Sequence, residues 1–285
     1  MNILSQDLSI GVLKEIESLK KFKAYDINLN LLSFNEIIEN WGFNLNNYNN
    51  LDLFSKKLKI LDIGVGKGQS SLYLASHGHE VWCVEPYIEY CYQIEMISKK
   101  FNFNIIVCNG TAEAIDKIKN KFDVVIFNAS LHHCDDPNLA LRLSYDCLKD
   151  GGLIRLYSET FLRPWNTKKG FKKKLEMDPI GMGHYGGNEH AYHNWEYIIM
   201  LKNAGFIDVE LDKPKDGTVL DKIEYRLKRR IGNKRIDNNS LVIILRIIYY
   251  MIQDLLSNFS LLRQCSIFST NFKARKQDND KKSIN

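Results

Sequence analysis

The sequence lacks several patterns that would place it in other protein classes. Its six cysteines include no Cys-x-x-Cys pair, and most lie in apolar runs. They are typical of reduced, buried thiols rather than of a disulfide framework or a zinc site. The first residues show no basic region followed by an unbroken apolar run, so we expect no signal peptide. No stretch reaches the roughly 18 uncharged apolar residues of a membrane span. We therefore expect a cytoplasmic protein.

The chain also lacks a strong charge bias. Its 285 residues include 39 Lys and Arg against 34 Asp and Glu, which gives a formal net charge of +5. So small an excess does not by itself indicate nucleic-acid binding. An apolar fraction of 45% is enough for a substantial core, and the length suits one α/β domain with additions.

What the chain does contain is a glycine-rich turn after a short apolar segment. Residues 59–63 predict a buried strand, and Gly64, Gly66 and Gly68 follow at alternate positions. A strand, a glycine turn and a helix start together point backbone amides at a nucleotide-type ligand. A dinucleotide fingerprint would need its third glycine at position 69, which is Gln69. This spacing disfavours a dehydrogenase.

After this turn, apolar strands alternate with amphipathic helices, which is typical of a parallel sheet. We expect strands at 59–63, 80–84, 103–108, 122–127, 153–157 and 206–211, and helices at about 68–77, 86–101, 112–119, 137–148 and 193–203. Glu85 ends the second strand, about 20 residues beyond the glycine turn. An acidic side chain there can accept hydrogen bonds from both hydroxyls of a ribose.

Together these motifs resemble class I S-adenosylmethionine-dependent methyltransferases. The pattern Asp62-x-Gly64-x-Gly66-x-Gly68 is similar to the first motif of that family, and residues 128–137 are similar to the fourth, with Leu-His-His before an Asp-Pro helix start. The resemblance covers about 59–211. It implies an α/β, Rossmann-like fold with a seven-stranded sheet, closed by an antiparallel strand that we place at 266–275.

The resemblance also implies the cofactor, S-adenosyl-L-methionine, and the residues that bind it. These are Asp62, Gly64, Gly66, Gly68, Glu85, Thr111, Ala112 and Asn128. Thr111 stands where similar methyltransferases usually have an Asp that receives the adenine amino group, so this contact would lack charge assistance. The backbone of Ala112 then meets an adenine ring nitrogen, and Asn128 contacts the methionine end.

Methyl transfer from a sulfonium is an in-line displacement that needs alignment and a proton acceptor. For an alcohol acceptor, histidine has a suitable pKa. His133 is the first candidate base because its loop borders the expected pocket; His190 is the second, and His132 adjoins the first. The alternative for each histidine is a structural hydrogen bond or a helix cap.

A glycine-rich segment at 181–193 precedes the helix that follows the fifth strand. Its Glu-His-x-Tyr sequence resembles methyltransferases of sugar and surface-glycan pathways. We hypothesise that Glu189, His190 and Tyr192, with His184, bind a hydroxyl-rich acceptor. The alternative is a loop held by its own hydrogen bonds. The spacing of His184, Glu189 and His190 fits no standard metal site, so we expect no metal.

The predicted domain organisation places additions around the methyltransferase domain. We expect a helical N-terminal cap at 1–58, the methyltransferase domain at 59–212 and 264–275, a helical insertion at 213–263, and a disordered polar tail at 276–285.

The insertion contains a basic stretch, 222–235, followed by an apolar run, 241–252, that is too short and too charged to span a bilayer. One interpretation is a buried helix with a solvated neighbour. Another is peripheral contact with anionic lipid through 222–256, on the inner face of a membrane. A third is a basic arm that grips RNA, although no aromatic recognition motif supports it.

The sequence thus predicts an O-methyltransferase for a small hydroxyl-rich or glycan acceptor, which would be lipid-linked if the insertion contacts a membrane. Methylation at nitrogen or carbon stays open. The alternatives are an RNA or protein methyltransferase and a non-catalytic partner subunit that keeps the cofactor fold.

Overall fold

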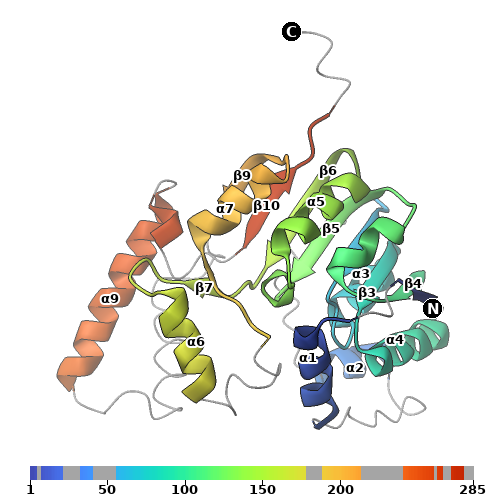
Figure 1. Cartoon of the computed structure of the whole chain (residues 1–285), viewed down its shortest axis with the longest axis horizontal. Coiled ribbons are helices and arrows are strands. Elements are labelled where there is room, and N and C mark those ends of the chain that lie inside the picture. Colours follow the sequence, from blue (N-terminus) through green and yellow to red (C-terminus); the bar gives the residue numbers. More distant parts are fainter. Residues whose placement is uncertain are drawn as a thin grey trace.

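The computed structural model describes residues 1–4, 8–21, 33–40, 56–177, 188–212, 240–259, 262–265 and 271–278. Its centre is one mixed sheet with the strand order β1-β4-β3-β2-β5-β6-β10-β9 (Figure 1). The strands are β1 (Asn2–Ile3), β2 (Lys59–Ile63), β3 (Glu80–Glu85), β4 (Ile105–Asn109), β5 (Phe122–Asn128), β6 (Leu148–Tyr157), β9 (Ile207–Leu211) and β10 (Phe272–Arg275).

The first six of these strands are parallel to one another, and β10 runs antiparallel to both β6 and β9. Parallel strands in such a sheet are covered on both faces and read as continuous apolar runs. The β2 segment Ile60–Ile63 is accordingly buried throughout. Its alternate side chains enter two separate hydrophobic clusters, Leu61 and Ile63 in one and Ile60 in the other.

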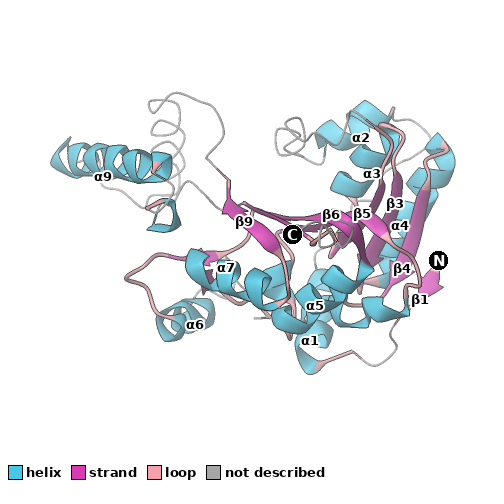
Figure 2. Cartoon of the chain, turned by 90° about the horizontal axis from the view of Figure 1, so that it is seen from above, coloured by secondary structure: helices cyan, strands magenta, loops and turns pink. Residues whose placement is uncertain are grey.

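Helices cover both faces of the sheet (Figure 2). The α-helices are α1 (Ile10–Lys21), α2 (Phe34–Asn40), α3 (Gln69–Ser76), α4 (Ile88–Phe101), α5 (Pro137–Cys147), α6 (Lys168–Met177), α7 (Asn194–Asn203) and α9 (Ser240–Asn258). Short 3₁₀ helices are η3 (Ala112–Lys117), η4 (Leu131–His133) and η6 (Arg263–Cys265), and a small separate sheet pairs β7 (Phe161–Leu162) with β8 (Tyr192–His193). The two strands of that sheet come from the segments that follow β6 and precede α7.

Local sequence accounts for where several elements begin. Helix α5 starts because the Asp136 side chain accepts a hydrogen bond from the Leu139 amide at 2.9 Å and Pro137 occupies the first turn. Helix α3 starts at Gly68, whose φ of 79° is left-handed. A side chain there would also collide with Ile94, since a Cβ would lie 2.5 Å from Ile94 Cγ1.

The structure confirms the predicted Rossmann-like methyltransferase fold, with one strand more than predicted. The additional strand is β1, which extends the sheet edge beside β4. The closing strand is present as β10, and 266–270 of the predicted strand lie outside the described residues. Strand β6 begins at Leu148, five residues before the predicted start, because the chain pairs with β5 across Gly151 and Gly152 instead of stopping there.

Other elements differ from what periodicity indicated. The segment expected as a helix at 112–119 is the 3₁₀ helix η3. In the N-terminal helix, the helical spacing of Ile10 and Leu13 predicts one apolar face, but these residues are 74% and 51% exposed, while Val12 is buried. Neither helix α6 nor the β7–β8 pair was predicted. Helix α6 gives no periodic apolar signal, because its sequence is lysine-rich and it has no buried face.

The closing strand provides a test of the core. Phe272 in β10 is fully buried in the larger cluster, with its ring 5.2 Å from that of Tyr197. We expect Phe272→Ala to lower the free energy of unfolding by about 3–5 kcal/mol, because it removes apolar burial and leaves a cavity. Denaturant unfolding measures this. Lys273→Ala removes a surface ion pair with Glu210; it is the control and should cost less than about 1 kcal/mol. Equal losses of stability in the two variants would contradict the placement of Phe272 in the core.

Candidate active site

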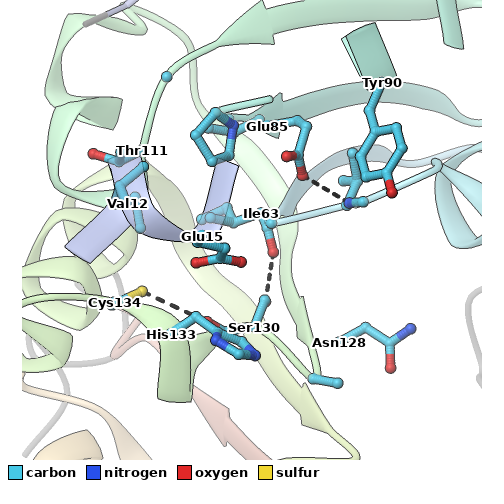
Figure 3. Close-up of a pocket in the computed structure, with 18 of the residues that line it drawn as sticks. Val12, Glu15, Ile63, Glu85, Tyr90, Thr111, Asn128, Ser130, His133 and Cys134 are labelled. Carbon is cyan, nitrogen blue, oxygen red and sulfur yellow. Dashed lines mark hydrogen bonds between the residues drawn. The ribbon is translucent and has the colours of Figure 1, made fainter. Parts of the chain in front are cut away.

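A cavity of about 430 Å³ lies at the carboxyl ends of the central strands. Its wall is built from the segments that follow β2, β3, β4 and β5, and helix α1 supplies Val12, Glu15 and Leu19 from the N-terminal part of the chain (Figure 3). In open α/β sheets this edge is where ligands bind. The sheet and helix α1 therefore bring together residues as far apart in the sequence as Val12 and Asp135.

The glycine turn after β2 packs directly against the segment after β5. Gly64 has a φ of 69°, and a Cβ on it would lie 2.5 Å from Ser130 Cβ. The Ser130 hydroxyl donates to the Ile63 carbonyl at 2.6 Å. Glycine is thus required at position 64 both by its backbone conformation and by the close approach of Ser130.

Glu85 is buried at the end of β3 and faces the turn. Its carboxylate accepts hydrogen bonds from the Gly66 amide at 2.8 Å and from the Tyr87 amide at 3.0 Å. Burial raises the pKa of Glu85 to about 8, although the two backbone donors act in the opposite direction. A carboxyl group held in this way can accept the hydroxyls of a ribose.

The next side of the cavity is formed by Gly110, Thr111 and Ala112, with Tyr90 and Pro86 nearby in the wall. Asn109, the last residue of β4, donates through Nδ2 to the carbonyls of Glu85 and Pro86, both at 2.9 Å. This side-chain amide therefore joins the ends of β3 and β4. Apolar and aromatic groups beside backbone polar groups suit a flat heterocycle.

The backbone amides of the loop after β5 donate to a buried carboxylate. Glu159 accepts backbone hydrogen bonds from Ser130, Leu131 and His132 at 3.3, 3.2 and 3.1 Å. His132 Nδ1 lies 2.6 Å from the same carboxylate. His132 is thus 4% exposed and bound to Glu159, and it does not line the cavity. Its role here is structural.

His133, by contrast, lies in the cavity wall. Its Nδ1 is 2.7 Å from the Asn188 carbonyl oxygen, which can only accept, so Nδ1 carries the proton. Asn188 in turn donates through Nδ2 to the His133 carbonyl at 3.1 Å. Burial lowers the pKa of His133 to about 3, with His132 and His190 adding to the effect. The imidazole is therefore neutral at physiological pH.

Glu15 enters the cavity from helix α1, and Figure 3 draws its carboxylate between Glu85 and the Ser130–His133 loop. Asn188 Nδ2 donates to Glu15 Oε2 at 3.3 Å. Burial raises the pKa of Glu15 to about 7. Sequence reasoning missed Glu15, and it also missed Asn188 and Glu159, since none of them belongs to a local motif.

The structure brings seven of the predicted site residues into the cavity wall and leaves the others elsewhere. Those in the wall are Gly64, Gly66, Glu85, Thr111, Ala112, Asn128 and His133. Asp62 is buried behind the turn, where its Oδ2 accepts from the hydroxyls of Ser70 at 2.7 Å and Ser71 at 2.6 Å. Asp62 therefore stabilises the start of α3, and Gly68 packs on Ile94 beside it.

The predicted acceptor residues that the structure describes lie outside the cavity wall. His190 is exposed, and its amide donates to the His132 carbonyl at 3.0 Å. Glu189 accepts from the Thr160 hydroxyl at 3.2 Å, and the Tyr192 ring packs 5.5 Å from that of Tyr197. His184 lies outside the described residues. Within the described part of the chain, no group of three His, Cys, Asp or Glu side chains could hold a metal ion.

Comparison with known proteins agrees with this geometry. Residues 61–156 match the family model of a methyltransferase domain, and this range contains the glycine turn, Glu85 and the His132–His133 loop. Residues 61–156 therefore belong to a methyltransferase domain, on the Rossmann-like fold of class I S-adenosylmethionine-dependent methyltransferases. The groups around the cavity suit the cofactor of that class, because Gly66 has open space in front of it while Glu85 and Thr111 offer acceptors.

Two curated relatives and one solved structure illustrate the breadth of this similarity. An S-adenosyl-L-methionine-dependent Diels-Alderase of Talaromyces variabilis is 30% identical over 161 residues, 53% of this chain and 54% of the relative. A ubiquinone biosynthesis O-methyltransferase of Ruegeria pomeroyi is 33% identical over 96 residues, 34% of this chain and 39% of the relative. The chain thus spans about half or less of the length of these relatives.

The solved structure is a Galdieria sulphuraria protein whose assignment as sarcosine dimethylglycine methyltransferase is provisional. It matches with a TM-score of 0.51 at 17% identity over 80% of each chain. At this identity the likeness supports the fold alone.

The buried carboxylate behind the histidine loop is open to test. Glu159→Gln replaces one of two acceptor oxygens with a donor that faces backbone amides, so we expect it to lower the free energy of unfolding by about 2–3 kcal/mol. Chemical denaturation measures the loss, and Glu89→Gln on the exposed face of α4 is the control. A Glu159→Gln protein as stable as wild type would show that the loop does not depend on this carboxylate.

Proposed function

We propose that this protein is an S-adenosylmethionine-dependent methyltransferase for a small, hydroxyl-bearing acceptor. The observation that carries the proposal is the cavity itself, in which the glycine turn, Glu85, Thr111 and His133 meet at one edge of the sheet. Glu85 and the turn amides hold the ribose, Thr111 and Ala112 border the adenine, and Asn128 contacts the methionine end. The bound cofactor supplies an activated methyl group; the chain supplies position and a proton acceptor.

His133 is the histidine that we propose as that acceptor. Because its Nδ1 proton is held by the Asn188 carbonyl, the other ring nitrogen is the one that can take a proton. Its low pKa makes it a weak base. A weak base is sufficient here, since an alcohol oxygen becomes strongly acidic as it gains the methyl group. His190 is exposed and outside the cavity wall, which favours His133 over it.

More specifically, we propose that the acceptor is a hydroxyl-rich molecule or a glycan that extends beyond His133. Asn188 contacts His133 of the cavity wall, and Glu189, the next residue, is close enough to raise the pKa of Glu15. A sugar extending along this path would find the carboxylate of Glu189 and the hydroxyl of Thr160. An RNA acceptor is disfavoured because the lining residues include Glu15, Glu113 and Asp135, which repel phosphates.

The histidine assignment gives a direct prediction. With labelled S-adenosylmethionine and a panel of sugars, glycolipids and small alcohols, we expect label transfer by the wild type. His133→Ala should reduce turnover on an accepted substrate about 10²-fold with cofactor affinity unchanged, and His190→Ala should have a smaller effect. Full turnover by His133→Ala would remove it as the base. Cofactor binding without label transfer to any acceptor would favour the alternative of a non-catalytic partner subunit that keeps the cofactor fold.

We further propose that the protein contacts anionic membranes through α9 and the basic residues before it. One side of α9 exposes Ile244, Leu245, Ile248, Met251, Ile252 and Leu255, each between 48% and 59%. These positions recur at helical spacing and form one apolar stripe. Basic residues at 222–235, which lie outside the described residues, precede the helix in the chain. An apolar helix face that follows a cationic stretch in the sequence suits an anionic bilayer surface.

In the described part of the chain, no helix is long and apolar enough to cross a membrane, so such contact would be peripheral. We expect the protein to float with vesicles that contain phosphatidylglycerol at low salt, but not with pure phosphatidylcholine vesicles. Leu245→Glu combined with Ile248→Glu should abolish flotation, because it places charge in the apolar stripe. Lys172→Glu on α6 is the control for charge alone. Absence of flotation by the wild type would exclude this contact.

A further inference from the structure

Carboxyl groups dominate the charge of the cavity wall. Glu15, Glu85, Glu113 and Asp135 line it, and Lys67 is the single lysine among its described lining residues. The proposed function uses Glu85 for the ribose but gives no role to Glu15. Keeping an ionised carboxyl group half-buried inside a cavity costs free energy unless a positive charge compensates it.

Glu15 is held in place by the chain's own contacts. Helix α1 approaches the segment before β8 so closely at Gly11 that a Cβ there would lie 2.6 Å from Asn188 Oδ1. Asn188 is 8% exposed, and its Nδ2 donates to both Glu15 Oε2 and the His133 carbonyl. One side-chain amide thus ties Glu15 to the His133 loop.

The titratable groups near Glu15 come from three other segments of the chain. They are His132, His133 and Asp135 from the loop after β5, Glu189 beside Asn188, and Glu85 at the end of β3. His132 is already engaged by Glu159, and His133 is neutral. Burial first, and then the acidic neighbours, raise the pKa of Glu15 in the absence of a cation, although the hydrogen bond from Asn188 acts in the opposite direction.

We propose that Glu15 is the counter-charge for the sulfonium centre of S-adenosylmethionine, so that the cavity selects the methyl donor over its demethylated product. This inference rests on the proposed function. The donor and the product share the ribose, the adenine and the amino acid end, and they differ by the methyl group and its positive charge. A carboxylate placed between Glu85 and the His133 loop therefore acts on the one charge that distinguishes them. It also favours release of the product after transfer.

The same arrangement makes the selection depend on pH. Without ligand, Glu15 has a pKa of about 7 and is largely protonated at pH 6. A bound cation favours the ionised form, so donor binding at pH 6 must release a proton, and donor affinity rises as the pH increases toward 8. The neutral product gains nothing from the ionised form. Titration of Glu85 affects donor and product alike, because both carry the ribose, and it cancels in the ratio of their affinities.

Calorimetric titration of the full chain tests this without an acceptor. The ligands are S-adenosylmethionine, S-adenosylhomocysteine and 5′-methylthioadenosine, each at pH 6, 7 and 8. For the wild type we expect the ratio of donor to product affinity to increase by about tenfold between pH 6 and 8. In Glu15→Gln the ratio at pH 8 should fall about tenfold and become independent of pH. Glu17→Gln, two residues further along α1 and exposed, is the matched control and should behave as wild type.

Each contrary result has a distinct meaning. Failure of the wild type to bind either the donor or the product would overturn the proposed function. Binding of both with a pH-independent ratio that Glu15→Gln leaves unchanged would overturn the inference alone. An equal loss for donor and product with no loss for 5′-methylthioadenosine would assign Glu15 to the ligand's amino group and also overturn it. Should Glu15→Gln fold poorly, the wild-type pH series decides by itself.

Discussion

The cavity depends on the direct contact between the segments that follow β2 and β5. Gly64 leaves no room for a side chain beside Ser130, and the Ser130 hydroxyl bonds to the last carbonyl of β2. This contact sets how far apart the glycine turn and the histidine loop lie. Every other wall residue is placed relative to these two segments, since β3 and β4 continue the sheet on one side of β2 and β6 lies beyond β5.

Buried carboxylates bound to backbone amides then hold the edges of the site. Glu85 accepts two amides at the end of β3, and Glu159 accepts three from the loop after β5. Backbone donors at strand ends have no partner within the sheet, so a carboxylate satisfies them without another strand. The chain thus uses acidic side chains both to build the loops and to face the cavity. This explains how so many acidic groups can be accommodated around one ligand-sized space.

The parts that the sequence predicted well are those in which local order carries the information. The strands from β2 to β5, the glycine turn and Glu85 can be predicted from apolar runs and motif spacing. The glycine turn and Glu85 line the cavity. The acceptor residues were harder to place, because the orientation of Glu189 and Tyr192 depends on the pairing of β7 with β8. Glu15 and Asn188 meet although they are 173 residues apart, and nothing in their immediate sequence, or in that of Glu159, marks them. Asp62, although part of the glycine motif, is directed away by two serine hydroxyls.

The charge of the cavity narrows the chemistry further. An adenosyl sulfonium is cationic at its reacting atom, and Glu15 and Asp135 in the wall favour that charge. A phosphorylated acceptor would meet these carboxylates with only Lys67 among the described lining residues to offset them. A neutral hydroxyl-bearing molecule avoids this repulsion, and it can still donate hydrogen bonds to the same carboxylates. The acidic wall therefore supports cofactor binding and acceptor choice together, which is why we favour sugars over nucleic acids.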